Sequence, residues 1–201
     1  MIALIDYGVG NLRSVEKALT SVGGDVCITS DADQIAAAEK VVLPGVGHFG
    51  DGMSGLIERD LVEPIIESVN QKKPFLGICL GMQLFFSGSD EAPGISGLNL
   101  LPGMVRLFEG NSIKIPQIGW NQINPKGVSR ILDGIEPGSY AYFNHGYYCD
   151  PSRDENILAT TEYGIEYASV VGQDHLYGVQ YHPEKSQQVG LRILRNFVEQ
   201  R

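Results

Sequence analysis

The sequence predicts an α/β protein built around a parallel sheet, and three observations support this. Four short apolar runs rich in β-branched residues are typical of buried strands: Ile2–Ile5, Val26–Thr29, Lys40–Leu43 and Phe75–Ile78. The stretches between them are typical of helices, and strands that alternate with helices pair in parallel. The chain has 201 residues, 43% of them hydrophobic, with no linker or repeat. One domain spanning residues 1–201 is therefore expected.

The clearest helix is predicted after the first strand, because its apolar residues recur three or four positions apart until Gly23-Gly24 ends the pattern. A second helix is predicted from about Leu61 to Gln71, before Pro74. Beyond about residue 100 the pattern changes to short strands and turns, which favours antiparallel or mixed pairing: Met104–Leu107, Tyr140–Phe143, Ile157–Thr161 and Tyr167–Val171. A last strand, Leu176–Tyr181, precedes an amphipathic C-terminal helix.

The charge balance excludes several classes of partner. Twenty-four acidic and fifteen basic side chains give a formal net charge of -9. Such a chain repels phosphate backbones and anionic membrane surfaces, so neither nucleic acid nor a membrane is an expected partner. The first residues lack a basic leader segment, and no apolar run approaches the roughly 20 residues of a membrane span. A soluble cytoplasmic protein is expected.

The three cysteines, Cys27, Cys79 and Cys149, are far apart and form no C-x-x-C pair, so neither a disulfide framework nor a metal site is expected. Cys79 differs from the others in its surroundings. It lies in Gly77-Ile78-Cys79-Leu80-Gly81, where an apolar strand meets a G-x-C-x-G turn before an amphipathic helix. This pattern is typical of a nucleophile elbow, in which a strained turn and the start of a helix expose and activate the nucleophile. Cys27 and Cys149 are assigned to packing.

A thiolate nucleophile needs a proton acceptor, and His182 is the strongest candidate among four histidines. In His182-Pro183-Glu184 the imidazole and a carboxylate are two residues apart on a predicted extended segment, so their side chains share one side. Glu184 could then orient the imidazole and stabilise its cationic form. A surface turn is the alternative for this segment taken alone.

The third candidate element is Pro44-Gly45-Val46-Gly47-His48-Phe49-Gly50, directly after a strand. It matches the dinucleotide fingerprint G-x-G-x-x-G, but that motif belongs at the first strand-to-helix turn, and this one follows a third strand. The loop is better suited to lend a backbone N–H to an oxyanion, with Val46 as one donor and Leu80 as the other. Glycine at positions 45 and 47 makes a peptide flip inexpensive, so the Val46 donor could be switchable.

Gly77–Leu84 together with His182-Pro183-Glu184-Lys185-Ser186 resembles the triad-type glutamine amidotransferases, which implies a three-layer α/β/α sandwich with a mostly parallel central sheet. Within this family, the segments Asp6–Val15, Pro44–Gly47 and Gln117–Asn121 resemble the branch that serves as glutaminase subunits of imidazole glycerol phosphate synthases. The resemblance implies hydrolysis of glutamine to glutamate and ammonia, without a cofactor. It also implies a heterodimer with a β/α-barrel cyclase of histidine biosynthesis, which would receive the ammonia.

The resemblance also assigns roles to residues. Cys79 would be the nucleophile, His182 the base and Glu184 its orienting group. Five residues would hold glutamine: Gly47, Gln83, His145, Gly146 and Tyr147. Four would face the partner: Asn11, Trp120, Tyr142 and Lys185.

Two residues depart from the usual family pattern: Asn144 stands where an apolar residue is usual, and Gly146 where Ser or Thr is usual. The same glutaminase chemistry could serve another synthase, such as one that builds amidated surface sugars. A catalytically silent regulatory subunit is the alternative of another class, although the presence of Cys79, His182 and Glu184 together disfavours it.

Overall fold

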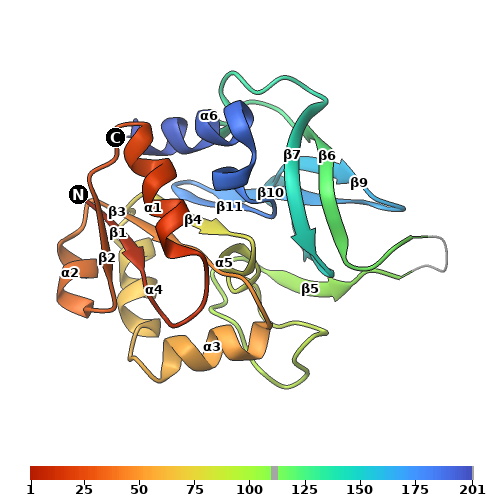
Figure 1. Cartoon of the computed structure of the whole chain (residues 1–201). Helices are drawn as coiled ribbons and strands as arrows, with labels where there is room; N and C mark the ends of the chain where they lie inside the picture. Colours follow the sequence, from red (N-terminus) through yellow and green to blue (C-terminus); the bar gives the residue numbers. More distant parts are fainter. Residues whose placement is uncertain (110–112, 201) are drawn as a thin grey trace.

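The computed structural model describes residues 1–109 and 113–200, and within them eleven strands form one mixed sheet (Figure 1). Five neighbouring strands pair in parallel, in the spatial order β2, β1, β3, β4, β11. Their bounds are Val26–Thr29 for β2, Ile2–Ile5 for β1, Lys40–Leu43 for β3, Phe75–Ile78 for β4 and Leu176–Val179 for β11. The four strands predicted in the first half are therefore four of the five parallel strands, and β11 is the fifth.

The other strands pair antiparallel. The sheet continues from β11 through β10 (Glu166–Gln173), β9 (Ile157–Glu162), β6 (Gln117–Pro125) and β7 (Ser139–His145). Two further strands branch off this path, because β8 (Tyr147–Pro151) pairs with both β10 and β5 (Gly103–Leu107). The change of pairing after residue 100 agrees with the change of pattern in the sequence.

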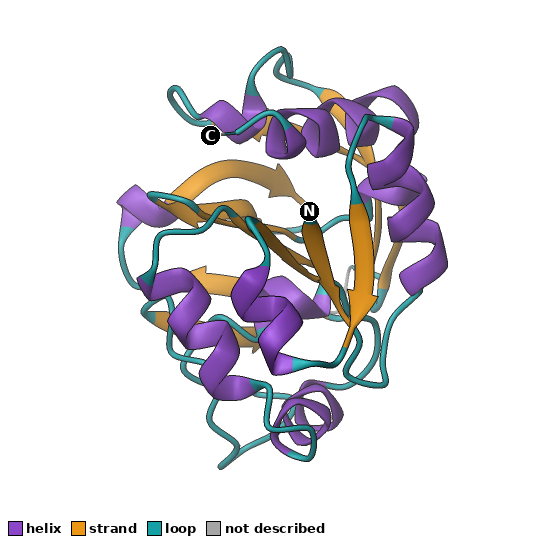
Figure 2. Cartoon of the chain, turned by 90° about the vertical axis from the view of Figure 1, so that its left-hand side faces the viewer, coloured by secondary structure: helices purple, strands orange, loops and turns teal. Residues whose placement is uncertain are grey.

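Helices cover both faces of the parallel part (Figures 1 and 2). One layer holds α1 (Leu12–Ser21) and α6 (Gln187–Val198), and the other holds α2 (Ala32–Ala37), α3 (Phe49–Ile57) and α4 (Val62–Asn70). The short helix α5 (Leu80–Gln83) follows β4, and single 3₁₀ turns lie at η1 (Arg130–Leu132), η2 (Asp154–Asn156) and η3 (Pro183–Lys185). This is the predicted α/β/α sandwich.

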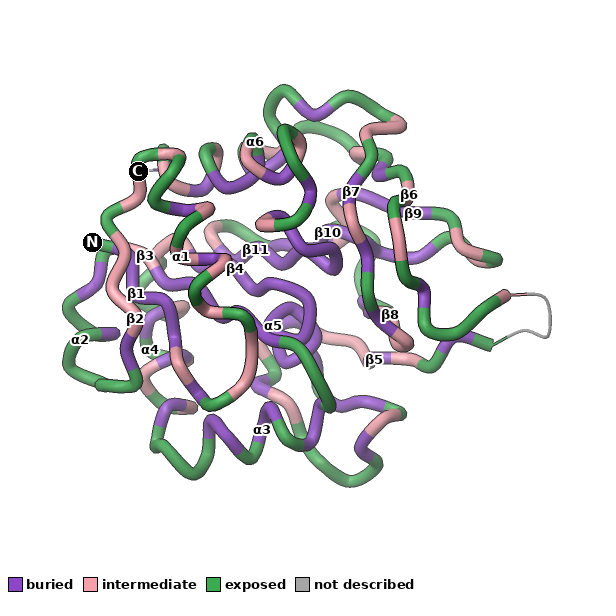
Figure 3. The backbone as a smooth tube through the Cα atoms, viewed as in Figure 1, coloured by how far each residue is buried: buried purple, intermediate pink, exposed green. Residues whose placement is uncertain are grey.

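The two cores follow from the alternation of side chains along each strand. In β1, Ile2 and Leu4 belong to the cluster under α1 and α6, whereas Ala3 and Ile5 belong to the cluster under α2 to α4. All four residues are buried, as are those of β4 and β11 (Figure 3). Strands buried on both faces need near-continuous apolar sequence, which explains why these runs are recognisable in the sequence.

Element boundaries differ little from expectation. Strand β11 ends at Val179, two residues before the predicted end, and Gln180 and Tyr181 continue as an irregular buried segment towards His182. The strands β6 and β8 were not predicted as strands. No helix within residues 1–109 and 113–200 is long and apolar enough to cross a membrane.

Candidate active site

Cys79 lies on a strained turn at the carboxyl end of β4. Its backbone has φ +53° and ψ -108°, a region that residues other than glycine rarely adopt, and its N–H donates to Val179 O at 2.8 Å. The turn requires glycine at position 81, because a Cβ there would lie 1.8 Å from the carbonyl oxygen of Leu43. The helix expected after the turn is only the four-residue α5, so its dipole can contribute little to thiolate stability.

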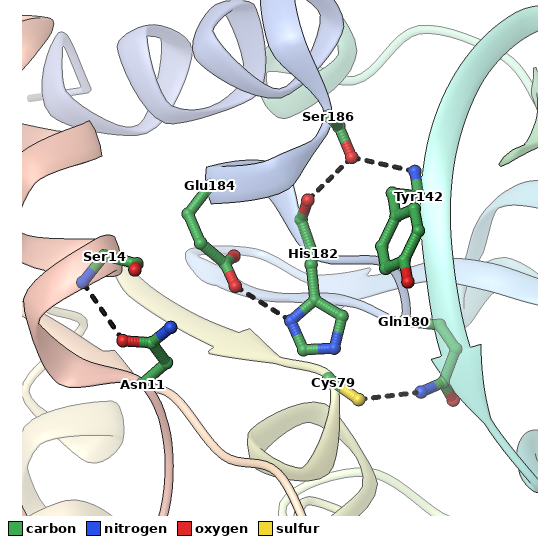
Figure 4. A network of polar contacts seen from close by, with 8 residues as sticks. All are labelled: Asn11, Ser14, Cys79, Tyr142, Gln180, His182, Glu184 and Ser186. Carbon is green, nitrogen blue, oxygen red and sulfur yellow. Dashed lines mark hydrogen bonds and ion pairs between the residues drawn. The ribbon is translucent and has the colours of Figure 1, made fainter. Parts of the chain in front are cut away.

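His182 and Glu184 form a buried pair beside this cysteine (Figure 4). His182 Nδ1 and Glu184 Oε1 are 2.9 Å apart, and both side chains are only 2% exposed. The imidazole Nε2 forms no hydrogen bond of standard geometry among the described residues and faces the Cys79 sulfur in Figure 4. Around the pair, the Ser186 hydroxyl donates to His182 O at 2.6 Å and accepts from the Tyr142 N–H at 2.9 Å. The backbone around the imidazole is thereby fixed.

The environment favours the cationic form of His182. Burial by itself lowers the pKa of this imidazole, but its interactions with Cys79 and with the Glu184 carboxylate outweigh burial and raise the pKa to about 10. The raised pKa favours the imidazolium form of His182 at neutral pH. A cationic neighbour is one of the features that activate a cysteine as a nucleophile, and the short helix α5 does not provide it.

The predicted oxyanion loop, residues 44–47, adopts a closed arrangement. The Leu80 N–H, one of the two predicted oxyanion donors, donates to the carbonyl oxygen of Gly45 at 3.3 Å. The Gly45–Val46 peptide therefore presents its oxygen, rather than the Val46 N–H, to the place where an oxyanion would form. Val46 is 39% exposed at the mouth of the site, and Gly47 has φ +115°, which favours glycine.

A cavity of about 230 Å³ opens over Cys79 and contains all five residues predicted to bind glutamine. Its lining is Val46, Gly47, Cys79, Leu80, Gln83, Glu91, Pro116, Asn144, His145, Gly146 and Tyr147. The structure therefore brings together residues from five separate segments of the chain. This size suits a small amino acid.

Within the cavity wall, Gln83 and His145 share one acceptor. Gln83 Nε2 donates to the Tyr147 carbonyl at 3.2 Å, and His145 Nδ1 lies 2.7 Å from the same oxygen. Burial lowers the pKa of His145 to about 4, so the ring is neutral and its Nδ1–H donates. His145 therefore holds the Tyr147 backbone in place.

Two residues that the sequence analysis did not select also belong to the site. Gln180 is fully buried, and its Nε2 lies 3.8 Å from Cys79 Sγ while its Oε1 accepts from Gln83. Glu91 lines the cavity, and its Oε2 accepts from the Phe49 N–H at 2.7 Å. The position of Gln180, two residues before His182, was an available signal. Glu91 comes from the loop of residues 87–97, which the sequence connects to no site.

Three of the four residues predicted to face a partner lie in contact around β6 and β7. Trp120 and Tyr142 form a T-shaped aromatic pair with ring centroids 6.1 Å apart, and Lys185 Nζ lies 5.7 Å from the Tyr142 ring centroid. Asn11 caps α1, a helix that contacts η3, the turn that carries Lys185. The exposed face of β6 and β7 also holds Ile118, 61% exposed, opposite Asn144.

Residues 1–109 and 113–200 contain no group of three or more His, Cys, Asp or Glu side chains suited to a metal ion. Cys149 is buried in the core, as packing requires. Cys27 is only half-buried because β2 is an edge strand of the sheet.

Fold and site together define an α/β enzyme with a cysteine, a histidine and a glutamate gathered at the carboxyl end of a parallel sheet. The chain belongs to the class-I glutamine amidotransferase family, whose model matches residues 3–200. Solved structures agree on the fold. A chain described as "Structure of PurLQS from Thermotoga maritima" has a TM-score of 0.77 at 18% identity, covering 98% of this chain and 96% of that one. A crystal structure of a glutamine amidotransferase has a TM-score of 0.78 at 15% identity, covering 99% and 98%.

Closer relatives are found by sequence. The chain is 46% identical over 203 residues to the imidazole glycerol phosphate synthase subunit HisH of Syntrophotalea carbinolica, covering 98% of each chain. It is 47% identical over 200 residues to the protein of the same name from Methanothermobacter thermautotrophicus, covering 99% of this chain and 98% of the relative. The HisH subunit of Moorella thermoacetica is 48% identical over 198 residues, covering 98% and 94%.

Proposed function

We propose that this chain is the glutaminase subunit of an imidazole glycerol phosphate synthase and supplies ammonia to a cyclase partner in histidine biosynthesis. The observation that carries the proposal is the buried Cys79, His182 and Glu184 arrangement on a chain that matches HisH subunits over nearly its full length. The relatives reported above share one description, which favours this acceptor over a surface-sugar synthase. A silent regulatory subunit would have no need of the charged pair beside Cys79.

The proposed reaction has two halves. The Cys79 thiolate attacks the side-chain carbonyl carbon of glutamine, and the His182 imidazolium gives its proton to the departing nitrogen, which leaves as ammonia and leaves a thioester. Neutral His182 then takes a proton from a water molecule that attacks the thioester. Glutamate leaves, and the thiolate and imidazolium are restored. Glu184 accepts from Nδ1 of His182 and stabilises the imidazolium, both before the attack and after glutamate has left.

Substrate recognition is assigned to the cavity wall. The Tyr147 backbone, positioned by Gln83 and His145, together with Gly47 and Gly146, would bind the amino acid moiety through main-chain groups. Main-chain contacts explain how Gly146 can replace the usual hydroxyl residue. One carboxylate oxygen of Glu91 accepts a hydrogen bond from the Phe49 N–H. The carboxylate is also suited to pair with the α-ammonium group of glutamine.

The oxyanion loop supplies a control point. In the closed arrangement the Gly45 carbonyl occupies the Leu80 N–H and would repel a developing oxyanion. A flip of the Gly45–Val46 peptide would remove that oxygen and bring in the Val46 N–H, so that both donors face the intermediate. We expect the flip to accompany docking of a partner that holds its own substrate.

The partner is proposed to be a β/α-barrel cyclase, in a heterodimer, contacting Trp120, Tyr142, Lys185 and Asn11. An aromatic pair of the exposed Trp120 and the half-buried Tyr142, with a neighbouring cation, is typical of a protein interface. The test is reconstitution. The chain, mixed with the cyclase of the same organism and its nucleotide substrate, should release glutamate and form imidazole glycerol phosphate from glutamine. Glutamate release without product, or no complex by size-exclusion chromatography, would contradict the proposed partner.

A further inference from the structure

Tyr7 is a buried tyrosine whose hydroxyl lies against the oxyanion loop. The side chain is 1% exposed, and the hydroxyl donates to the carbonyl oxygen of Pro44 at 2.6 Å. Burial raises the pKa of this phenol, and Cys79 raises it further, so the hydroxyl keeps its proton and remains a donor. Tyr7 therefore connects the segment after β1 to the residue that precedes the Gly45–Val46 peptide.

The segment after β1, Tyr7–Gly10, contacts Gly45 at both of its ends. A Cβ on Gly45 would lie 2.3 Å from the Tyr7 hydroxyl and 2.9 Å from Leu80 Cβ, so only glycine fits there. A Cβ on Gly10 would lie 3.5 Å from Gly45 Cα, which brings the other end of the segment against the loop. The Pro44–Gly45 peptide is thus held between the Tyr7–Gly10 segment and the nucleophile turn.

We propose that Tyr7 is a positioning residue that holds the oxyanion loop closed, an inference that rests on the proposed glutaminase function. A peptide flip at Gly45–Val46 needs compensating changes of the backbone angles on both sides of that peptide. The hydrogen bond from Tyr7 fixes the plane of the Pro44–Gly45 peptide, so it opposes the change in φ of Gly45 that would accommodate the flip. With this restraint, the arrangement in which Gly45 O occupies the Leu80 N–H is favoured.

The segment also connects this restraint to the expected partner surface. Asn11 follows Gly10 directly, and its side chain accepts from the Ser14 N–H at the start of α1 (Figure 4). A partner that contacts Asn11 would act on the chain four residues from Tyr7. Movement of this segment would loosen the Tyr7 contact with Pro44 and permit the flip.

The test is Tyr7→Phe, which removes the hydroxyl and keeps the ring. Loss of one neutral hydrogen bond corresponds to roughly a 2- to 10-fold change in the balance between two states. The free chain carrying Tyr7→Phe should therefore hydrolyse glutamine about 2 to 10 times faster than the wild type, with unchanged KM. The complex with the cyclase and its nucleotide substrate should keep the wild-type kcat, because its loop is already open. The ratio of the rate of the loaded complex to the rate of the free chain therefore falls by the same factor.

Tyr181→Phe is the matched control. Tyr181 is also fully buried, but it lies in the core under α1 and α6, and its hydroxyl has no hydrogen-bond partner among the described residues. This control should change neither rate. If the free Tyr7→Phe chain does not fold, the variant is co-expressed with the cyclase, and the complex without the nucleotide substrate should release glutamate faster than the corresponding wild-type complex.

The outcomes separate this inference from the proposed function. If the wild-type complex does not hydrolyse glutamine, the proposed function fails whatever Tyr7 does. If the wild type is stimulated by its partner but the Tyr7→Phe free chain is no faster, the positioning role is wrong. A parallel fall of the free and the stimulated rates, with a lower melting temperature, would also overturn it, because Tyr7 would then be merely structural.

Discussion

On the nucleophile side of the site, Cys79, His182 and Glu184 lie in an arrangement suited to attack, whereas on the opposite side the Gly45 carbonyl occupies an N–H that the reaction would need. The first side is built on β4 and on the segment after β11, both anchored in the two-sided core. The second is a loop with glycine at two of its four positions. From this difference we expect the free chain to hydrolyse glutamine slowly although the nucleophile side is already assembled.

Control of activity by the orientation of one peptide, Gly45–Val46, requires little free energy from a partner. A missing oxyanion donor costs on the order of 100-fold or more in rate. A partner must therefore favour the open loop by about 3 kcal/mol, a modest demand on a protein interface. Rebuilding the triad on each docking event would require movement of buried strands and would cost far more.

The largest expected effect is on the nucleophile side. Cys79→Ser should lower glutamine hydrolysis by about 10⁴-fold or more, because the hydroxyl is a much weaker nucleophile at neutral pH. Ammonia-dependent synthesis by the complex should be unchanged, since ammonia bypasses the first half-reaction. A glutamine-like electrophile should label Cys79 and spare Cys27 and Cys149, as peptide mapping would show. Loss of both activities in a folded complex, or first labelling of Cys149, would contradict the assignment.

The next effect distinguishes the members of the pair. His182→Ala should lower kcat by about 10³-fold, because it removes the group that transfers the proton. Glu184→Ala should cost at least about tenfold less, since the imidazole can still reach its working pose. Steady-state kinetics of the stimulated complex provide the measurement. Equal losses would show that Glu184 does more than orient His182.

The oxyanion side gives the third effect. The free chain should hydrolyse glutamine about 100-fold or more slowly than the complex with its cyclase and nucleotide substrate. Glutamate release should be measured for the free chain, for the complex without the nucleotide and for the loaded complex. Equal turnover in the first and last samples would show that the loop is a permanent oxyanion hole, and the contrast between the two sides would disappear.

The smallest effect is the pH dependence of stability. The pKa of His182 is raised in the folded protein from 6.5 to about 10, so its contribution to stability is complete below pH 6.5. As the pH rises from 6.5 to about 10, the unfolded state releases the proton first and the contribution is lost. The difference in melting temperature between the wild type and His182→Gln should therefore shift against the wild type over this range. A constant difference would show that the imidazole is neutral in the resting enzyme.

Much of the site could be recognised from the sequence because each part carries a local signature. The glycines around Cys79 indicate a tight turn, and the spacing of His182 and Glu184 places their side chains together. Glu91 could not be recognised in this way, because it reaches the cavity only through the path of the loop of residues 87–97. The contact of the buried His145 ring with the backbone of Tyr147 could not be recognised either, because it depends on how the two strands meet in the fold.

By itself the sequence determined the α/β class and the parallel half of the sheet, and it predicted Cys79 as the reactive cysteine. These features depend on apolar runs and turn residues within a few positions of one another, and short-range sterics decide them. Only the tertiary structure decided that residues 44–47 are in the closed arrangement, that the pKa of His182 is raised and that Tyr7 contacts Pro44. Those properties depend on distances between atoms far apart in the sequence, where packing and charge act together.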